Sequence, residues 1–487
     1  MYQISLMLEN RIFRGRLMSK KWLMTAALLS LSACASVNTT AELTQDLRIS
    51  APTSWKSLSH QDNVQAINWL AEFNDSGLSA LVGEALTHNH NLLASAERIE
   101  QAKALAISGA AARLPSVNLA SSATRNLIQN VPDTKSYGAS LSVSWEADLW
   151  GRIADRAKAG YASADAAKAD YEAARLSIAG QTVQAWFDLV EGAQQVALAQ
   201  DDLQTRQRSS RLVERRYGRG VSSSLDVRLA RSALAGSEAT LALREQLVAN
   251  AGRRLELLLG RYPANAIEAA LSLPVLAPLS GVGRPEDVLA RRPDIRAAEA
   301  RLTASGLRAS EARKALLPRL SFTPSASTGG AKFSDIFDLD TLAGRLLGNL
   351  AQPVFQGGAL KAEVRRTRAA QREQIETYAQ LVLRAWREAE DALDGEVYLA
   401  RREAALTVST TEAQEAEKLA IREYGRGVGT IFEMLDAQRR RISAQSQLIA
   451  ASKERAANRV RLHLAIAGDF NTQVVKTAAF VDEDTSL

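Results

Sequence analysis

Few side chains in this chain of 487 residues are of types that carry out catalysis or bind metal ions, since it has one cysteine and four histidines. Two of those histidines lie in the run HNHN at residues 88–91, but no cysteine or acidic cluster accompanies them to complete a metal site. The sequence also lacks a Gly-x-Ser-x-Gly elbow, a phosphate-binding glycine loop and a zinc motif. Acidic pairs such as Glu388 and Glu390 are typical of a solvated helix surface. We therefore expect no enzyme activity, no metal and no cofactor.

The single cysteine, Cys34, is the one residue for which covalent chemistry is expected. Residues 18–21, MSKK, are cationic, and residues 22–31 form an apolar stretch too short to span a bilayer as a helix. The tetrapeptide LSAC then ends at Cys34. This arrangement resembles the signal of bacterial lipoproteins, in which the cysteine thiol receives lipid and the cysteine becomes the mature N-terminus. The alternative is a buried cysteine that acts as a small apolar side chain.

The lipoprotein resemblance implies further features of the N-terminus. Residues 1–33 would be a removed signal peptide, with Met18 as an alternative translation start. Cys34 would carry diacylglyceryl and N-acyl lipid, including palmitate, and each buried CH₂ group adds about 0.8 kcal/mol to membrane binding. The next residue is Ala35 and not aspartate, which in that signal system implies export to the outer membrane.

The net charge of +6 does not indicate nucleic-acid binding, because most of it lies in the signal-like segment. Residues 1–33 contain five basic residues and one acidic residue, a net charge of +4. No basic stripe with interleaved aromatic residues follows, so we expect no nucleic acid as a partner. The aromatic content is only 5%, which favours long helices over an aromatic-rich globular core.

An internal repeat divides the chain into two halves. The segment YGRGV occurs at residues 217–221 and again at residues 424–428, which is 207 residues later. The segments NLLASAERI, at residues 91–99, and DIRAAEARL, at residues 294–302, align at an offset of 203. Repetition over this length predicts two copies of one architecture.

Long uninterrupted stretches between prolines predict long helices. No proline lies between Pro132 and Pro263, and none follows Pro353. The two longest expected helices, residues 152–217 and 359–424, would each be about 100 Å long, and the second has coiled-coil spacing of apolar residues. Shorter helices are expected at residues 91–113, 224–259, 294–316 and 431–467. The two short helices of each half together nearly match the long one, so we expect them to stack end to end beside it.

Alternating apolar and polar residues predict two hairpins of β-strands, one in each half. The pattern is strict in SYGASLSVSWEAD, residues 136–148, and weaker at residues 115–125, with counterparts at residues 319–328 and 344–355. Strands of about ten residues span an outer membrane when tilted, whereas no apolar run long enough for a membrane helix occurs elsewhere. A soluble hairpin packed under a helix is the alternative for either one alone. Four strands cannot close a barrel, so two, three or four copies would have to combine.

These patterns give one expected division of the chain. It consists of the signal at 1–33, a lipidated and equatorial segment at 34–90, repeat 1 at 91–260 with its hairpin at 115–149, a linker at 261–293, repeat 2 at 294–468 with its hairpin at 318–356, and a tail at 469–487.

The turns at the ends of the two long helices can be explained locally. One glycine in each turn, Gly218 or Gly220 in the first and Gly425 or Gly427 in the second, is expected to take the left-handed conformation that ends a helix. Each turn is followed by a Ser/Thr-x-x-Asp/Glu sequence that predicts a capping box, and the expected pairs are Ser223 with Asp226 and Thr430 with Glu433.

Four motifs together resemble a known family. They are SWEADLWGR at 144–152, RRPDIRAAEARL at 291–302, QPVFQGGAL at 352–360 and VLRAWREAEDAL at 382–393. They are similar to the outer membrane factors of bacterial tripartite efflux pumps, the TolC/OprM-like proteins, and in particular to the NodT-type lipoproteins of RND pumps. The resemblance runs from about residue 69 to residue 470.

The resemblance implies a mainly α-helical protein with a membrane β-barrel part, present as a homotrimer. Its twelve-stranded barrel would lie in the cell outer membrane, and its twelve-helix tunnel, with an equatorial belt, would extend into the periplasm. The implied partners are a periplasmic adaptor (membrane fusion protein), an inner-membrane RND-type transporter and outer-membrane lipid. The implied function is passive export of drugs or other small molecules, and hence multidrug resistance. A lipid-anchored periplasmic adaptor or coiled-coil scaffold is the alternative, although two helical hairpins and membrane-length strands disfavour it.

The family also implies roles for the turns. In this family the helix tips contact the adaptor. The residues of this chain at the matching positions are Tyr217, Gly218, Gly220, Tyr424, Gly425 and Gly427. Acidic rings constrict the family's entrance, and the matching residues are Glu433 and Asp436, for which a capping role and a solvated helix face are the respective alternatives. Tyr424 matches a tyrosine that latches neighbouring helices, whereas Gly429 replaces a latch arginine for which Arg426 or Arg422 would have to substitute.

Overall fold

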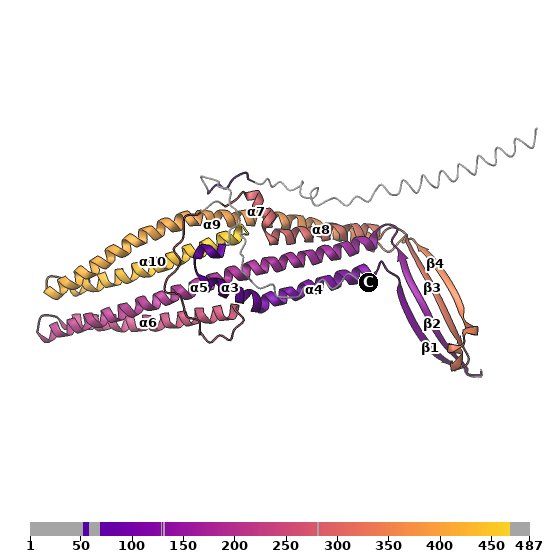
Figure 1. The fold of residues 1–487 in the computed structure, drawn as a ribbon, viewed down its shortest axis with the longest axis horizontal. Helices are drawn as coiled ribbons and strands as arrows, with labels where there is room; N and C mark the ends of the chain where they lie inside the picture. Colours follow the sequence, from indigo (N-terminus) through magenta and orange to yellow (C-terminus); the bar gives the residue numbers. More distant parts are fainter. Residues whose placement is uncertain (1–51, 58–68, 128, 130–131, 280–281, 468–487) are drawn as a thin grey trace, which may run out of the picture. The chain divides into compact units, whose positions relative to one another are not determined.

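The computed structural model describes residues 52–57, 69–127, 129, 132–279 and 282–467, in two compact units (Figure 1). The strand unit contains Gly109–Ala159 and Leu302–Ile375. The helical unit contains Gly160–Arg301 and the described parts of Ile49–Ser108 and Glu376–Leu487. The expected signal at 1–33, the proposed lipidation residue Cys34 and the expected tail at 469–487 lie outside the described residues.

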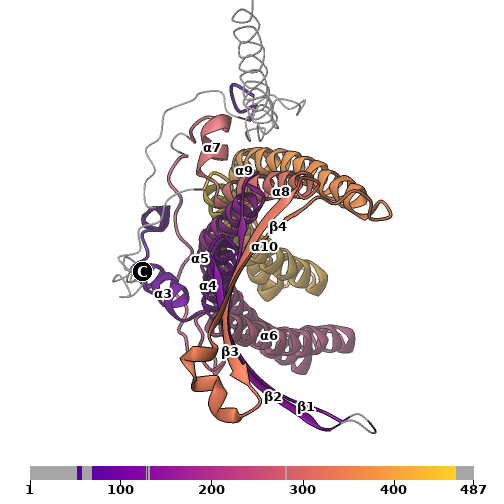
Figure 2. The ribbon, with the colours of Figure 1, turned by 90° about the vertical axis from the view of Figure 1, so that its right-hand side faces the viewer.

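The strand unit is built on one antiparallel sheet, with its strands side by side in the order β1-β2-β3-β4 (Figure 2). The strands are β1 (Ser116–Asn126), β2 (Thr134–Ala147), β3 (Arg319–Gly330) and β4 (Ala343–Ala351). The two hairpins of the repeat meet where β2 pairs with β3, in a register that runs from Tyr137 opposite Gly330 to Ala147 opposite Leu320. As a result β1 and β4 are the edges, each paired on one side within the chain.

The fourth strand is shorter than the sequence indicated. It was expected to extend to residue 355, but β4 ends at Ala351. The next two residues are Gln352 and Pro353, and proline cannot donate a backbone hydrogen bond to a neighbouring strand. Between β3 and β4 the chain forms two short 3-10 helices, η3 (Phe333–Phe337) and η4 (Leu339–Thr341).

The two long helices are α5 (Arg152–Gly218) and α9 (Ala359–Arg426), with 67 and 68 residues. Asp148 caps the start of α5, because its two carboxylate oxygens accept hydrogen bonds from the backbone of Ile153 and Ala154 at 3.1 and 2.7 Å. Both helices continue from the strand unit into the helical unit. No helix among the described residues contains a stretch that is long and apolar enough to cross a membrane.

The shorter helices stack in pairs, as the lengths indicated. The pairs are α4 (His90–Ala111) with α6 (Ser224–Leu258) and α8 (Pro293–Lys314) with α10 (Ile431–Ala465). The first pair meets where Asn89 donates a hydrogen bond to the carbonyl of Leu258 at 2.8 Å. The second meets where Arg292 donates one to the carbonyl of Ala465 at 3.0 Å. Each junction therefore joins helices far apart in the sequence.

Three further helices occur in segments for which no helix was expected. They are η2 (Trp69–Phe73), α3 (Ser76–His88) and α7 (Pro285–Arg291). The run HNHN lies at the break between α3 and α4, where the Asn89 side chain accepts hydrogen bonds from the backbone of Asn91 and Leu92. This asparagine therefore has a structural role as the cap of α4. No group of three potential metal ligands occurs among the residues that the structure describes.

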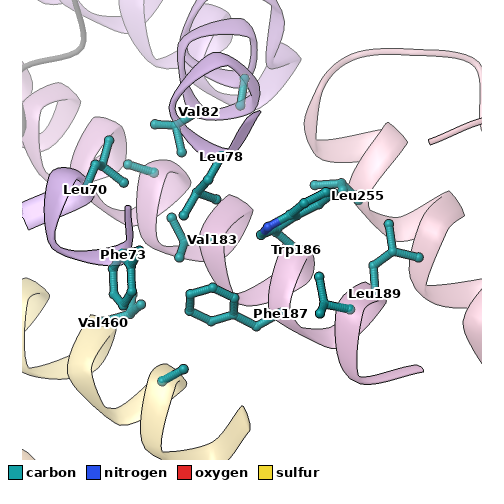
Figure 3. Close-up of a cluster of buried hydrophobic side chains, with 14 of the residues drawn as sticks. Leu70, Phe73, Leu78, Val82, Val183, Trp186, Phe187, Leu189, Leu255 and Val460 are labelled. Atoms are coloured by element: carbon teal, nitrogen blue, oxygen red, sulfur yellow. The ribbon is translucent and has the colours of Figure 1, made fainter. Parts of the chain in front are cut away.

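The largest hydrophobic core of the helical unit gathers side chains from both repeats and from η2 and α3 (Figure 3). Phe73 lies against Phe187 of α5 with ring centroids 5.2 Å apart, and Val460 of α10 belongs to the same cluster. Burial of such side chains stabilises by about 1.5–3 kcal/mol each relative to exposure. The core therefore links the two repeats within the helical unit.

A buried arginine adds ionic contacts beside this core. Arg459 of α10 is 0% exposed, pairs with Glu72 of η2, and lies 2.6 Å from Glu396 of α9. Glu72 also lies 2.6 Å from His463 of α10. Burial alone would raise the pKa of Glu72, but the hydrogen bond with His463 and the charge of Arg459 outweigh it and hold the pKa below its ordinary value.

Candidate functional site

The turns that follow α5 and α9, at residues 217–221 and 424–428, are called the tip turns here, and they end their helices in the same way. Gly220 and Gly427 have φ angles of +77° and +83°, the left-handed conformation, and so they are the glycines that the turns require. Gly218 lies within α5 and Gly425 within α9. Each turn is closed by a backbone hydrogen bond from its valine, Val221 to Arg216 at 3.0 Å and Val428 to Glu423 at 3.1 Å.

Both predicted capping boxes are formed. Asp226 accepts from the backbone of Ser223 at 3.1 Å, and the serine hydroxyl accepts from the Asp226 backbone at 3.2 Å. In the second turn, one carboxylate oxygen of Glu433 accepts from both the backbone and the hydroxyl of Thr430, at 2.7 and 2.9 Å. These hydrogen bonds hold the pKa of Glu433 below its ordinary value, so this carboxylate is charged at the start of α10.

The two tips pack against each other through a small apolar cluster. It contains side chains of all four helices: Val213, Val227, Ala230, Tyr424, Ile431 and Met434. The two tyrosines of the repeated YGRGV segment differ sharply, since Tyr424 is 3% exposed and Tyr217 is 50% exposed. Identical local sequences therefore occupy different environments, and Tyr217 is the one available to a partner.

A clamp on Tyr424 crosses from one hairpin to the other. The Arg216 guanidinium of α5 lies 5.0 Å from the Tyr424 ring centroid and donates to the carbonyl of Gly425 at 3.1 Å. The Tyr424 hydroxyl lies 3.2 Å from the Ser222 hydroxyl of the first turn. Tyr424 thus holds neighbouring helices together within one chain.

The cation of this clamp is not one of those proposed from the sequence. Arg426 and Arg422 were the expected substitutes for the latch arginine, but Arg216 of the other repeat lies over the Tyr424 ring. The counterpart of Arg216 at the repeat offset is Glu423, so the repeat itself gave no signal for it. Only the packing of one hairpin on the other brings Arg216 to Tyr424.

Asp436 lies one turn beyond Glu433 on α10, and its carboxylate is fully engaged. One oxygen pairs with Arg439 and the other accepts from Arg440 at 2.5 Å. The hydrogen bond from Arg440, together with that from Arg439, holds the pKa of Asp436 below its ordinary value. Both arginine side chains are about three-quarters exposed, at 76% and 73%. Their spacing of three and four residues is a sequence signal for these pairs, and the expectation for Asp436 as a gate residue did not include them.

Farther from the tip, buried polar side chains join the two hairpins again. Arg206 of α5 is held by Asp202 at 3.1 Å and donates to Gln438 of α10 at 3.0 Å. Gln438 in turn donates to Ser209 of α5 at 2.8 Å. Because all of these side chains are buried, each relies on the others for its hydrogen bonds, and separating the hairpins here would leave them unpaired.

Two grooves flank this contact between α5 and α10. The return-helix groove lies between α6 and α10, with Asp202 and Arg206 of α5 also lining it, and it has Asp436 and Arg439 among its lining residues. The long-helix groove lies between α5 and α9, and α10 contributes only Arg441 to it. A pair of hairpins with two distinct grooves near its tip can contact different molecules on its two sides.

A family profile described as "Outer membrane efflux protein" matches residues 81–261 and residues 285–468 of the chain. Together these segments cover more than half of the sequence, and each falls largely on one repeat.

Similar proteins match along most of the chain. The pyoverdine export outer membrane protein OpmQ of Pseudomonas putida is 31% identical over 460 residues, covering 90% of this chain and 95% of that protein. The probable outer membrane lipoprotein SilC of Salmonella typhimurium is 26% identical over 410 residues, covering 84% and 89%. Among solved structures, the outer-membrane channel OprN matches with a TM-score of 0.79 at 26% identity, covering 86% and 97%. The expected fold class, with long helices in two repeats and four strands, is confirmed by this likeness.

Proposed function

The chain belongs to the outer membrane efflux protein family, and from this membership we propose that three copies form an exit duct gated at the helix tips. Its function is that of an outer-membrane channel of a tripartite efflux system, through which small molecules such as drugs leave the cell. In this proposal the inner-membrane pump supplies the energy, and the duct carries out no reaction and uses no cofactor. The likeness to channels over nearly the whole chain disfavours the alternative of a lipid-anchored adaptor or scaffold.

The observation that carries the proposal is the open sheet in a chain that also has two helical hairpins. The edge strands β1 and β4 each have one neighbour within the chain. In lipid, unpaired backbone groups cost several kcal/mol each, so these edges require partners. Neighbouring copies supply them if β4 of one copy pairs with β1 of the next. Three copies of four strands give a closed barrel of twelve, the number that the family resemblance implied.

The tips are the proposed gate and the proposed contact with a periplasmic adaptor. Glu433 and Asp436 lie at the start of the return helix α10, which would line the entrance. Opening would require the clamped tips to move, and the Arg216–Tyr424 contact would resist that motion. The adaptor would contact the exposed part of the turns, including Tyr217, and would link the duct to an RND-type pump.

The proposed lipid anchor on Cys34 rests on the LSAC signal and on the likeness to SilC, which is named a lipoprotein. Lipid on this residue would tether the N-terminus to the outer membrane. Cys34→Ser should abolish incorporation of radiolabelled palmitate during growth. Unchanged labelling would contradict the anchor.

The experiment that tests the proposed function is single-channel conductance of the full-length, detergent-extracted protein in a planar bilayer. A duct that rests with clamped tips should give small, discrete openings. Mass measurement in the same detergent should give three copies. Silence from correctly folded trimers would contradict the channel and favour the scaffold.

A further inference from the structure

A pocket with a volume of about 590 Å³ lies where α10 ends and α8 begins, between the long helices α5 and α9. We call it the junction pocket. All four helices line it, through residues that include Leu176 of α5, Pro293 of α8, Ala392 of α9 and Leu464 of α10. These residues all belong to the helical unit. Binding sites for drug-sized molecules commonly have volumes in this range.

The junction pocket lies on the face of α9 and α10 opposite η2 and α7. On α10, His463 contacts Glu72 of η2, whereas Arg461, two positions earlier, lines the pocket. On α9, Trp386 donates a hydrogen bond to a backbone carbonyl of α7 at 3.2 Å, whereas Glu388, two positions later, lines the pocket. Two positions along a helix correspond to a rotation of about 200°, so these side chains point to opposite sides.

In the proposed duct, the face that carries the junction pocket is the inner one. A ring of helices that conducts molecules must keep its interior clear, so the added segments η2 and α7 have to lie outside the ring. The opposite face of α9 and α10, with the pocket, then lies along the path of export. One chain supplies every residue that lines the pocket, so no neighbouring copy is needed to complete it.

The lining combines an apolar part with ionised side chains. The apolar residues are Ala173, Leu176, Pro293, Ala392, Leu464 and Ala465. The ionised residues are two cations and three carboxylates: Arg292, Arg461, Asp294, Glu388 and Asp391. The pocket therefore carries one excess negative charge beside an apolar surface, and this combination suits a ligand with an apolar body and one positive charge.

Both cations of the junction pocket already have acidic partners. Arg292 lies 2.8 Å from Asp294 and 2.9 Å from Glu388, and it also donates a hydrogen bond to the last carbonyl of α10. Arg461 lies 2.5 Å from Glu454. An anionic ligand would have to displace these carboxylates, so the pocket disfavours anions.

Asp391 is the carboxylate that a cationic ligand can use. Its side chain is 71% exposed, and its ion-pair partner Arg387 lies 3.9 Å away, too far for a hydrogen bond. Such exposed pairs contribute little, so the ammonium group of a ligand can replace Arg387. Asn458, which is only 4% exposed, adds a neutral acceptor to the lining. Its amide donates to the carbonyl of Ala392 at 2.8 Å, while its side-chain oxygen accepts no hydrogen bond from the described residues.

We propose that the junction pocket is a binding site for cationic amphiphilic small molecules on the wall of the duct, with the apolar body of the ligand over Leu176 and Leu464 and its ammonium group beside Asp391. The inference rests on the proposed function, because that function places this face inside the duct. It adds a class of exported compound and a place where such a compound pauses. Three copies would give three sites, and their excess negative charge would raise the local concentration of cations over that of anions.

The test uses full-length protein in detergent and two dansyl probes that differ only at the end of a short side arm. One arm ends in a trimethylammonium group, and the other ends in a neutral tert-butyl group of the same shape. Fluorescence titration, corrected for the signal of empty micelles, should show that the ammonium probe binds about fivefold more tightly than its twin. This preference should shrink as the salt concentration rises.

Variants of Asp391 test the charge. Asp391→Asn should remove the preference for the ammonium probe. Glu412→Gln is the matched control, because Glu412 is exposed on the same helix, does not line the pocket, and lies about 30 Å farther along α9. It should leave the preference unchanged.

Variants of Ser177 locate the binding. Ser177 lines the pocket and is exposed, so Ser177→Trp should fill the space without disturbing the core and should weaken binding of both probes at least tenfold. Ser177→Ala leaves the space open and should bind both probes as the unmodified protein does. Equal melting temperatures of the two variants would show that the tryptophan acts on the pocket and not on folding.

Three results would overturn the proposal: equal binding of the two probes, an unchanged preference in Asp391→Asn, or unchanged binding in Ser177→Trp. Planar-bilayer conductance of the unmodified protein tests the duct separately. A silent channel with charge-dependent binding would contradict the proposed function and keep the pocket only as a ligand site. Conducting channels with equal binding of the two probes would keep the duct and overturn the pocket.

Discussion

The charge at the start of α10 offers a quantitative test of the gate. Four ionised side chains lie on this stretch, Glu433, Asp436, Arg439 and Arg440, and their formal charges cancel. The expected acidic ring is therefore balanced by cations on the same helix. The low pKa of Asp436 keeps this carboxylate ionised at neutral pH, so the balance holds under ordinary assay conditions.

Replacing Asp436 with alanine should make the entrance cationic. Each chain then gains one net positive charge, and a trimer gains three. With about 10 Å between each charge and the ion path, the three charges raise the energy of a cation there by about 1.2 kcal/mol in water and lower that of an anion equally, so the ratio of cation to anion permeability falls about 70-fold without screening. Screening at physiological salt reduces the effect on this ratio to about threefold. The pairs are exposed, so the folded protein should be almost as stable as before.

The assay is the reversal potential of single channels in a KCl gradient, which gives the ratio of cation to anion permeability. Asp436→Ala should lower this ratio about threefold at physiological salt, and by up to about 70-fold as the salt concentration approaches zero. Arg440→Gln should raise it by a similar factor, and the two changes together should restore it. An unchanged ratio in Asp436→Ala, or a double variant that does not return to the starting value, would refute the placement of these residues at the entrance.

Three further predictions concern the clamp and the buried arginine. Tyr424→Phe removes the hydroxyl that reaches the first turn and so costs the clamp about 1 kcal/mol, which should increase the frequency of resting openings about fivefold. Tyr217→Phe changes the exposed counterpart and should leave this frequency unchanged. Equal effects of the two variants would contradict the clamp. Arg459→Met removes the buried cation that pairs with Glu396, and it should lower the free energy of unfolding by about 3 kcal/mol. Thermal denaturation in detergent measures this loss, and an unchanged melting temperature would contradict the prediction. Glu72 has a lowered pKa, so its stabilisation is present above the ordinary carboxylate pKa and is lost as pH falls through the lowered value. The melting temperature of the native protein should therefore fall more steeply in acid than that of Glu72→Gln, and parallel curves would count against this network.

Much of the architecture was predictable from the sequence because its determinants are local. Helix ends follow from backbone limits, so the absence of proline and the turn glycines fixed α5 and α9 to within two residues of the expected bounds. The capping boxes involve residues three apart, and their hydrogen bonds formed as expected. The end of β4 before Pro353 also has a local cause, because proline cannot donate to a neighbouring strand even though the alternating pattern continues past it.

The burial and contacts of side chains in identical local sequences were decided by the tertiary structure. Tyr217 and Tyr424 stand in the same pentapeptide, yet only Tyr424 is buried, because burial depends on which hairpin packs over it. Arg216 of α5 lies over that ring although it precedes Tyr424 by 208 positions in the sequence. A contact of this kind depends on the register of one helical hairpin against the other. The same is true of the long-helix groove, where residues of α5, α9 and α10 form one cationic surface. The sequence by itself determined the elements and their ends through backbone chemistry, whereas side chains distant in sequence were brought together only by packing.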